Sequence, residues 1–445
     1  MNEPRLVSVS RRCDGVSAEA LLASARGRER FYWNQDDLVY VGIGVAAEIT
    51  AWGERRFAAI EEKARTLFSG VRVLGGAEPM ALPRLFGGFS FQPDFITEHT
   101  WAQFAPAYFV LPHYQLFRRG ETAWLTLNVQ IAADELLDEG ALRAALDAEC
   151  ALAQQSTSSP IVPAAPLSSD YPMSLDEWTG LIESARSSMK AGALNKVVLA
   201  RVCELRFAER VNVEGALDYL NDAYSGCYRF LFEPIPHLAF FGATPELLVR
   251  TSGKTVETMA LAGSIRRGGT LAEDEALGAS LLADPKERHE HALVVEGIRD
   301  RLTSLTTMLD IPSEPGVLRL RNIQHLHTAI CGSLKAPCGV VPLAEALHPT
   351  PALGGSPRAD ALEFIRQREP VPRGWYAAPI GWIDSHLDGA FVVAIRSAVC
   401  QNERVWLYAG AGIVADSQPQ KEWEETALKF SPMLNALGAG PDVLA

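Results

Sequence analysis

AGAGIVADSQPQKEWEETALKF, residues 409–430, is the stretch from which the rest of the chain can be interpreted. Its small residues at 410–412 predict a turn at which the backbone can approach a ligand closely. The Asp, Ser and Pro within 416–419 are typical of a helix start. The stretch therefore predicts a close backbone approach followed by a helix.

Charged residues recur at helical spacing along that predicted helix. Glu422, Glu425 and Lys429 stand at i, i+3 and i+7, so they share one face. A second helix, expected from residue 285, repeats the acidic pair with Glu287 and Glu290. Either pair could be a plain solvated face. If both faced one cleft, each like-charge contact at about 5 Å and an effective dielectric of about 20 would cost roughly 3 kcal/mol, which a divalent cation such as Mg²⁺ would relieve.

The composition is that of a globular protein with an acidic balance. Apolar residues make up 48% of the 445 residues and charged residues 21%, which suits one large domain or two smaller ones. The 41 basic and 54 acidic residues give a formal net charge of −13, which argues against nucleic acid as a partner. An acidic substrate would therefore need a metal ion or local cations in order to bind.

The cysteines and the N-terminal residues bear on the compartment. Seven cysteines are scattered without a CxxC spacing, so we expect thiols that act as small core residues in a reducing environment. The first residues lack the apolar core of a signal peptide, and no apolar run reaches the length of a membrane span. The expected location is cytoplasmic, with no membrane partner.

A Ser- and Pro-rich segment at 156–172 is interpreted as a linker. Residues 1–155 are expected to form an N-terminal sub-domain that contributes strands, and residues 173–440 the catalytic region. The expected strands are 31–33, 38–46, 86–91, 107–118, 123–131, 196–205, 229–233, 238–243, 247–251, 381–384, 390–399 and 404–409. The expected helices are 55–68, 133–155, 174–190 and 285–305, besides the one that begins near residue 419.

Three further residues could carry chemistry, and each also has a structural interpretation. Lys196 opens the apolar strand KVVLAR, where it could act as a base or simply be salt-bridged. Glu246 follows a strand at a turn and could be a general acid if it is desolvated, or a plain turn residue. Arg396 lies in the apolar strand AFVVAIRSAV and needs an anionic partner, either a ligand carboxylate or a structural Asp or Glu.

Eight strings in series resemble the chorismate-utilising enzymes, a family that includes isochorismate, salicylate, anthranilate and aminodeoxychorismate synthases. They are KVVLAR, FFGATPELLVR, ALAGSIRRGG, KERHEH, HPTPALGGSPR, RGWYAAPIGW, AIRSA and AGAGIVADSQPQKEWEETALK, within about residues 190–435. The N-terminal half resembles the family more loosely, through FYW and GGFSF. The resemblance implies an α/β (α+β) fold of two large, mostly antiparallel β-sheets packed face to face, with helices outside and the active site between the sheets.

The resemblance also implies a magnesium site and a chorismate site. Mg²⁺ would be held directly by Glu290 and Glu425, with Glu287 and Glu422 acting through water, and it would take the ring carboxylate of chorismate. The other residues implied at the substrate are Arg396, Tyr376, Lys429, Gly410 and Gly412 at the enolpyruvyl carboxylate, His325 and Leu353 beside the ring, and Gly263 and Ser264 at the ring-carboxylate end.

Within the family, the residue at the position of Lys196 separates the reactions. Members that add water carry lysine there, so Lys196 would deprotonate the water that attacks C2, and Glu246 would protonate the departing C4 hydroxyl. Ala262 stands where aminodeoxychorismate synthases carry a nucleophilic lysine. The resemblance is therefore closest to isochorismate synthase, an isomerase of the hydroxymutase type that feeds siderophore, menaquinone or salicylate synthesis.

Two alternatives remain at this stage. One is salicylate synthase, which also eliminates pyruvate, and the other is a non-catalytic chorismate-binding protein, which would not need the acid–base pair of Glu246 and Lys196. The expected partner is chorismate alone, without a glutaminase subunit, and the chain is expected to be a monomer or a weak homo-oligomer. Two positions depart from the family, since many relatives have glycine in place of Ala378 and threonine in place of Ser264.

Overall fold

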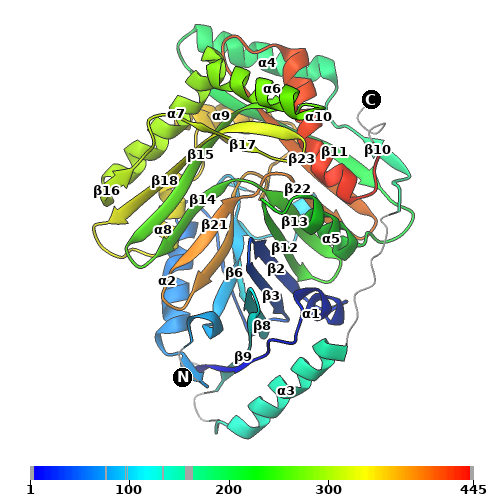
Figure 1. Cartoon of the computed structure of the whole chain (residues 1–445), viewed down its shortest axis with the longest axis vertical. Helices are drawn as coiled ribbons and strands as arrows, with labels where there is room; N and C mark the ends of the chain where they lie inside the picture. The colour runs from blue at the N-terminus through cyan, green and yellow to red at the C-terminus, as the bar shows by residue number, and fades with distance from the viewer. Residues whose placement is uncertain are drawn as a thin grey trace.

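The computed structural model describes residues 5–75, 78–95, 97, 99–132, 135–155 and 164–440. Within these residues, strands form a 13-stranded and a 10-stranded sheet (Figure 1). Among the described strands, β1 (Arg5–Arg12) and β5 (Arg72–Leu74) pair in parallel, and the other pairings are antiparallel. The predicted α/β (α+β) fold of two large, mostly antiparallel sheets is confirmed.

Both sheets mix strands from the two ends of the chain. In spatial order the larger sheet consists of β10 (Ser168–Asp170), β11 (Lys196–Arg206), β23 (Arg404–Ile413), β22 (Ser397–Gln401), β13 (Leu238–Thr244), β12 (Tyr228–Ile235), β2 (Arg30–Gln35), β3 (Leu38–Ile43), β8 (Tyr114–Arg119), β9 (Thr122–Ile131), β1 and β5, and β19 (Gly355–Ser356) also pairs with β11. The smaller sheet consists of β16 (Thr306–Asp310), β18 (Ile323–Leu334), β15 (Thr255–Arg266), β14 (Leu247–Ser252), β21 (Gly389–Val393), β20 (Pro379–Asp384), β6 (Arg84–Phe89), β7 (Ala107–Leu111) and β4 (Ala47–Ala51), and β17 (Gly316–Arg319) also pairs with β18. Residues 1–155 therefore contribute strands to both sheets.

Helices cover the outer faces of the two sheets (Figure 1). They are α1 (Ala18–Ser24), α2 (Arg56–Ser69), α3 (Glu139–Gln155), α4 (Leu175–Lys190), α5 (Val213–Ala223), α6 (Leu271–Ala283), α7 (Pro285–Thr303), α8 (Val340–Leu347), α9 (Arg358–Arg368) and α10 (Pro419–Ala436), with the short 3₁₀ helices η1 (Pro79–Ala81) and η2 (His99–Trp101). Helices α2, α7 and α8 pack on the smaller sheet, and α1, α3, α5 and α10 on the larger. Among the described helices, none has both the length and the apolar character that a membrane crossing requires.

The inner faces of the two sheets meet through aromatic side chains. Phe86 of β6 has its ring centroid 6.3 Å from that of Phe31 and 6.2 Å from that of Trp33, both on β2 of the other sheet. All three side chains are fully buried. Because each such burial contributes roughly 1.5–3 kcal/mol, this apolar interface holds the two sheets together.

Two predictions for the C-terminal third of the chain are wrong. The predicted strand 390–399 is two strands, β21 and β22, which belong to different sheets, and Arg396 between them has φ 51°. The predicted turn at 410–412 is the end of β23, because Gly410 and Gly412 continue the antiparallel pairing with β11. The chain crosses from one sheet to the other where the sequence suggests an uninterrupted strand.

The predicted helix 133–155 begins later than its apolar pattern suggests. Its described part is α3, and the Asp138 side chain accepts a hydrogen bond from the Ala141 backbone at 2.9 Å beside the helix start. Residues 133 and 134 lie outside the described residues. The capping box at Ser174 and Glu177, by contrast, is confirmed at the start of α4.

The predicted linker, 156–172, is described only in its second half. Residues 156–163 lie outside the described residues. Ser168–Asp170 form the strand β10, which pairs with the end of β11. The division of the chain at this segment remains a prediction, while its last residues belong to the larger sheet.

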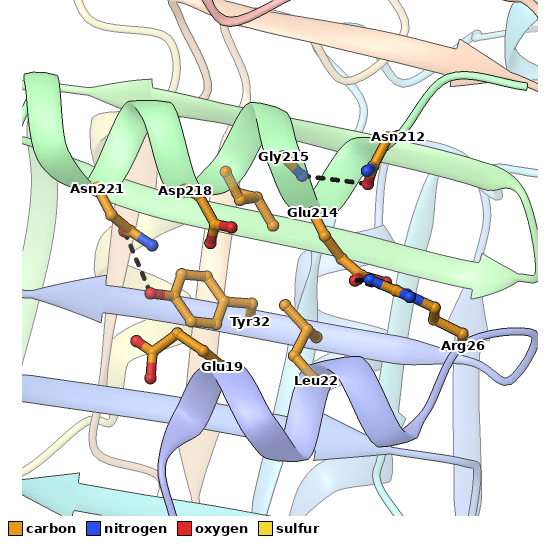
Figure 2. A pocket seen from close by; sticks show the side chains of 10 residues that line it. Glu19, Leu22, Arg26, Tyr32, Asn212, Glu214, Gly215, Asp218 and Asn221 are labelled. Carbon is orange, nitrogen blue, oxygen red and sulfur yellow. Dashed lines mark hydrogen bonds and ion pairs between the residues drawn. The ribbon is translucent and has the colours of Figure 1, made fainter. Parts of the chain in front are cut away.

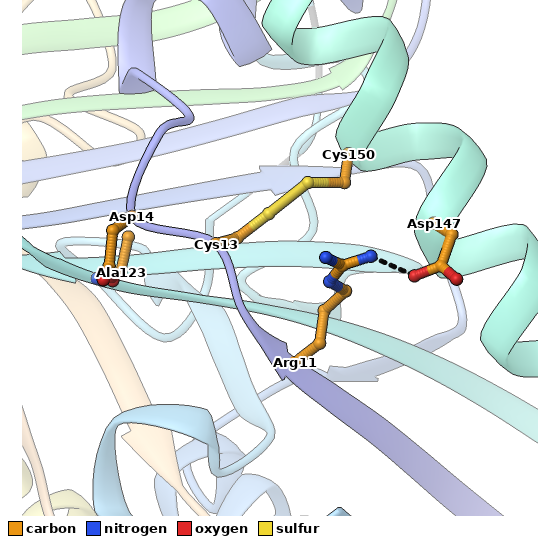
Figure 3. Close-up of a disulfide and its surroundings, with 6 residues drawn as sticks. All are labelled: Arg11, Cys13, Asp14, Ala123, Asp147 and Cys150. Carbon is orange, nitrogen blue, oxygen red and sulfur yellow. Dashed lines mark hydrogen bonds and ion pairs between the residues drawn. A yellow bond between two sulfur atoms is a disulfide. The ribbon is translucent and has the colours of Figure 1, made fainter.

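Two of the seven cysteines are joined, contrary to the expectation of free thiols. Cys13, just after β1, forms a disulfide with Cys150 of α3 (Figure 3). Nearby, Arg11 forms an ion pair with Asp147, and Asp14 accepts a hydrogen bond from the Ala123 backbone at 2.9 Å. The disulfide and the ion pair fasten α3 to the larger sheet. The pairing could not be predicted because the two cysteines lie 137 residues apart in sequence.

Candidate active site

One cavity gathers almost every site residue predicted from the sequence. Both sheets, α7 and α10 contribute to its lining. Its volume, including the part that is open to solvent, is about 680 Å³. The predicted residues that line it are Glu246, Gly263, Ser264, Glu287, Glu290, His325, Leu353, Tyr376, Arg396, Gly410, Gly412, Glu422, Glu425 and Lys429. Lys196 does not line the cavity itself. It lies directly behind one of the lining carboxylates.

That carboxylate is Glu290, and it forms a buried ion pair with Lys196. The Lys196 side chain is fully buried, and its Nζ donates a hydrogen bond to Glu290 Oε1 at 2.7 Å. A Cβ atom on Gly412 would lie only 2.6 Å from this oxygen, so the glycine leaves room for the pair. The salt-bridged alternative considered for this lysine is thus the arrangement found.

The two acidic helices meet at the cavity. Helix α7 begins where Asp284 accepts hydrogen bonds from the backbone of the next turn, and it carries Glu287 inward. Helix α10 likewise directs Glu422 into the cavity. The Lys286 ammonium lies 3.5 Å from Glu287 Oε1 and 3.6 Å from Glu422 Oε1, so it bridges the two helices. The alternative of two separate solvated faces is therefore wrong.

The crowding of these carboxylates affects their protonation. Burial and the neighbouring Glu425 raise the pKa of Glu422 to about 7. Burial and Glu290 likewise raise the pKa of Glu287. Burial also acts against ionisation of Glu290, but the attraction of Lys196 outweighs it and lowers the pKa of that carboxyl. The acidic set therefore needs nearby positive charge to remain ionised.

Carboxylate oxygens are the donor type that Mg²⁺ prefers, and all four predicted ligands supply them. In the part of the chain that the structure describes, no three His, Cys, Asp or Glu side chains lie close enough together to hold a metal ion. Each of these carboxylates has a lysine ammonium within 3.6 Å. The chemistry of the donors thus fits Mg²⁺, and the magnesium site remains a prediction.

Glu246 combines a turn position with deep burial. It lies between β13 and β14, its backbone N–H donates to Thr244 Oγ1 at 3.2 Å, and its side chain faces the cavity. Burial raises the pKa of Glu246 to about 8, even though the cations of Lys196, Arg396 and Lys429 oppose this shift. The carboxyl therefore carries a proton at neutral pH.

Arg396 faces the cavity without a carboxylate partner. Its Nη2 donates to His325 Nε2 at 3.4 Å, and His325 Nδ1 donates in turn to the Gly263 carbonyl at 3.3 Å. Burial holds the pKa of His325 well below its ordinary value, so the ring is neutral and Nε2 can accept. Among the described residues, no Asp or Glu lies within ion-pair distance of Arg396. The structural ion pair considered as an alternative for this arginine is absent from the described part of the chain.

A β-bulge shapes the end of the cavity next to Glu287. The pairing of β15 with β18 shifts between Ala262 and Ser264, and Gly263 in between has φ 80°. The bulge turns the Ser264 N–H toward Glu287 Oε2, to which it donates at 3.0 Å. Glycine suits this place because its conformation is left-handed and a Cβ would lie 3.2 Å from the same oxygen.

The remaining predicted residues line the side of the cavity formed by β23. Lys429 Nζ donates to the Gly410 carbonyl at 2.8 Å and forms an ion pair with Glu425. Tyr376 is buried and stacks on Tyr408 with ring centroids 5.2 Å apart. Burial raises the pKa of Tyr376 to about 12, so its hydroxyl keeps its proton and can donate a hydrogen bond.

Sequence reasoning missed two groups beside the cavity. Lys286 lies between the acidic helices, although its place next to Glu287 could have indicated this. Arg373 donates to the carbonyls of Leu353 at 2.9 Å and Val198 at 2.8 Å, both of which line the cavity. Its buried partner Glu369 accepts from the Ala200 backbone at 2.8 Å. Only the string RGWY, which contains Arg373, indicated that this segment mattered.

A second pocket lies on the outer side of the larger sheet, between α1 and α5 (Figure 2). Its empty volume on the same measure is about 410 Å³. Arg26 and Glu214 form an ion pair at its rim, and Tyr32 donates to Asn221 Oδ1 at 3.2 Å. It contains none of the predicted site residues, so the cavity beside α7 and α10 remains the candidate active site.

The whole chain is similar to enzymes that act on chorismate. An isochorismate synthase of salicylate biosynthesis from Pseudomonas aeruginosa is 38% identical over 99% of this chain and 91% of its own length. The isochorismate synthase MenF of Bacillus subtilis is 35% identical over 98% of this chain and 94% of its own length.

Solved structures extend the similarity to the fold. The menaquinone-specific isochorismate synthase MenF of Escherichia coli superposes with a TM-score of 0.79 at 30% identity, over 98% of this chain and 96% of that one. Anthranilate synthase component I of Streptococcus pneumoniae, at 21% identity and a TM-score of 0.70 over 92% of this chain and 91% of its own, shares the fold. The family model "Chorismate binding enzyme" matches residues 1–438, and the chain belongs to that family.

Proposed function

We propose that this protein is an isochorismate synthase, which adds water at C2 of chorismate and releases the hydroxyl at C4. The observation that carries the proposal is one cavity with a buried, unpaired arginine and a protonated carboxyl among four further carboxylates. Relatives that align over nearly the whole chain are named isochorismate synthases, which supports the same reaction.

Chorismate carries two carboxylates, and the cavity offers two different environments for them. Arg396 and Lys429 supply positive charge beside the Gly410 and Gly412 backbone, which suits the enolpyruvyl carboxylate. The acidic end suits the ring carboxylate only through a cation. Glu290 and Glu425 would hold Mg²⁺ there, with Glu287 and Glu422 acting through water. The ion supplies charge neutralisation between the ring carboxylate and the protein.

Glu246 is the proposed general acid. Its pKa of about 8 keeps it protonated at neutral pH, so it can donate a proton to the departing C4 hydroxyl. The same residue in contact with water would be ionised and unable to do so. Arg396 and Lys429 then stabilise the carboxylate that remains after the proton leaves.

Lys196 is the proposed general base for the attacking water. It can take a proton from water only as an uncharged amine, with its Nζ 2.7 Å from Glu290 Oε1. That amine would lie behind Glu290, at the wall of the cavity.

The test is incubation of the purified protein with chorismate and Mg²⁺, with products separated by chromatography. We expect isochorismate, no release of pyruvate and no fluorescent salicylate. Lys196→Ala should reduce turnover by about 10²- to 10⁴-fold, the range that general acid–base catalysis contributes. Salicylate would instead identify a salicylate synthase, and tight binding of chorismate without turnover would identify a binding protein. Wild-type turnover in the Lys196→Ala variant would contradict the assigned base.

A further inference from the structure

Three lysines are distributed among the four carboxylates of the cavity. Lys196 pairs with Glu290, and Lys429 pairs with Glu425. The single ammonium of Lys286 serves the other two carboxylates, because it lies 3.5 Å from Glu287 and 3.6 Å from Glu422. Every carboxylate of the acidic set therefore has an ammonium neighbour.

Lys286 is held more loosely than the other two lysines. The Lys196 side chain is 0% exposed and the Lys429 side chain 13% exposed, and both donate direct hydrogen bonds. The Lys286 side chain is 38% exposed, and its two contacts are longer than a hydrogen bond. It stands on the first turn of α7, at the solvent side of the cluster, so it can swing into solvent without moving the backbone.

The position of Lys286 is also where a metal ion would be needed. Its ammonium bridges a carboxylate of α7 and a carboxylate of α10, the two helices that supply the predicted ligands. A cation bound by both helices would meet the ammonium at close range and repel it. The two cations would therefore compete for the same carboxylates.

We propose that Lys286 is an internal counter-ion that balances the acidic cluster of the metal-free protein and is displaced when a divalent cation binds. This inference rests on the magnesium site of the proposed function. Lys286 thereby sets the metal affinity, because each binding event must break its contacts with Glu287 and Glu422. It also stabilises the cluster when no metal is present.

Two measurements on Lys286→Met follow from this role. The variant should bind Mg²⁺ about five- to tenfold more tightly than wild type, since no ammonium has to be displaced, and isothermal titration with MgCl₂ alone measures this. Its melting temperature should be lower than that of wild type without metal and equal to it at saturating Mg²⁺, since the metal then replaces the missing charge.

Lys421→Met is the matched control. It removes the same charge one residue before Glu422, but its side chain is exposed and does not line the cavity. Solvent and salt screen such a charge, so its Mg²⁺ affinity should stay within about twofold of wild type. Equal tightening in both variants would show a general charge effect and would overturn the role of Lys286.

The outcomes separate this inference from the proposed function. Wild-type protein that binds Mg²⁺ and makes isochorismate, with no tightening in Lys286→Met, overturns the inference alone. Tighter binding in Lys286→Met together with no isochorismate from any form overturns the proposed function alone. Wild-type protein that binds no Mg²⁺ overturns the inference, and turnover under the same conditions then decides the function independently.

Discussion

Glu246 shows how far burial alone changes the chemistry of a side chain. Its sequence context is an ordinary turn between two strands, where its backbone N–H donates a hydrogen bond to Thr244 Oγ1 and its carbonyl accepts one from the Val393 backbone. Removal of its carboxyl from water nevertheless raises the pKa to about 8 against the pull of three nearby cations. At neutral pH this makes it an acid rather than an anion.

We expect the kcat of the enzyme to fall as the pH rises through about 8, because Glu246 then loses the proton that the leaving hydroxyl needs. Glu246→Gln should lower kcat by about 10²- to 10⁴-fold, since an amide cannot donate that proton. Steady-state rates between about pH 6 and 9.5 measure both effects. Glu183→Gln, at an exposed position on α4, should keep the wild-type profile. A flat wild-type profile through pH 8 would argue against Glu246 as the acid.

For single residues, the sequence indicated which side chains line the candidate site but not which side chains they contact there. Family strings located Glu246, Arg396 and the acidic set, and the structure brings them to one cavity. The strings contain no information about pairing across space. The contact of Lys196 with Glu290 joins residues 94 apart in sequence, and only the folded chain makes it visible.

Strand β23 affects the cavity through the absence of a side chain. At Gly412 a Cβ would stand 2.6 Å from Glu290 Oε1 and 3.1 Å from Lys196 Cε, so any larger residue must displace the buried ion pair. The strand pairs with β11 on both sides of this point, so its backbone cannot shift to make room.

Gly412→Ala should therefore lower kcat/KM by about 10²-fold, the loss that follows a displacement of about 1 Å in catalytic groups. Gly226→Ala is the control, because a Cβ there meets nothing within 4 Å. Steady-state kinetics and thermal melting of both variants provide the comparison. Unchanged kinetics in Gly412→Ala would mean that the Lys196–Glu290 pair is not needed for turnover.

The Arg373–Glu369 pair replaces a missing strand at the edge of β11. Strand β19 pairs with Lys196 and Val197, and β10 pairs with the far end of β11. Between them the two side chains bond the Val198 carbonyl and the Ala200 N–H. An ion pair thus completes the hydrogen bonding of the strand that carries Lys196.

Arg373→Ala should destabilise the protein by about 3–5 kcal/mol, because it leaves the buried Glu369 carboxylate without its cationic partner. The control lies on α9, which ends just before Glu369, where Arg366 pairs with Glu363 at the surface. Arg366→Ala should destabilise the protein far less, because solvent and salt screen this exposed pair. Urea unfolding followed by circular dichroism measures both. Equal losses would show that burial of the Arg373 pair has no special weight.

Helices were predicted from the sequence where the helical spacing of residues is clear, as in α4 and α10. The prediction failed where tertiary pairing decides the outcome. Residues 390–399 read as one apolar strand, but they divide at Arg396 between two sheets. Short helices such as α1 and α8 were not predicted, since 7 or 8 residues show too little periodicity to separate them from loops.

At the scale of the molecule, both sheets contain strands from the N-terminal and the C-terminal parts of the chain. Strand β2 pairs with β12 in the larger sheet, and β6 pairs with β20 in the smaller one. The catalytic region alone would lose both partners and expose Phe232, whose ring packs 6.2 Å from that of Phe86. The sequence predicted that residues 1–155 contribute strands, but the family strings lie almost entirely in the catalytic region, so they did not indicate which strands pair.

We expect a fragment of residues 164–445 to lack a cooperative unfolding transition, whereas the whole chain unfolds in one step. Denaturant unfolding followed by both circular dichroism and tryptophan fluorescence compares the two. Limited proteolysis should degrade the fragment under conditions that leave the whole chain intact. A fragment that unfolds cooperatively and turns over chorismate would show that the N-terminal strands are dispensable.

Arg396 belongs both to the cavity and to the framework of the fold, because its backbone lies at the crossing between β21 and β22. A carboxylate bound by its guanidinium is therefore held within three residues of a strand of each sheet. The proposed substrate contact thus lies where the chain crosses between the two sheets and not on a surface loop. Ligand binding at Arg396 should slow amide hydrogen exchange in β21 and β22 together, because the ligand then restrains one strand of each sheet.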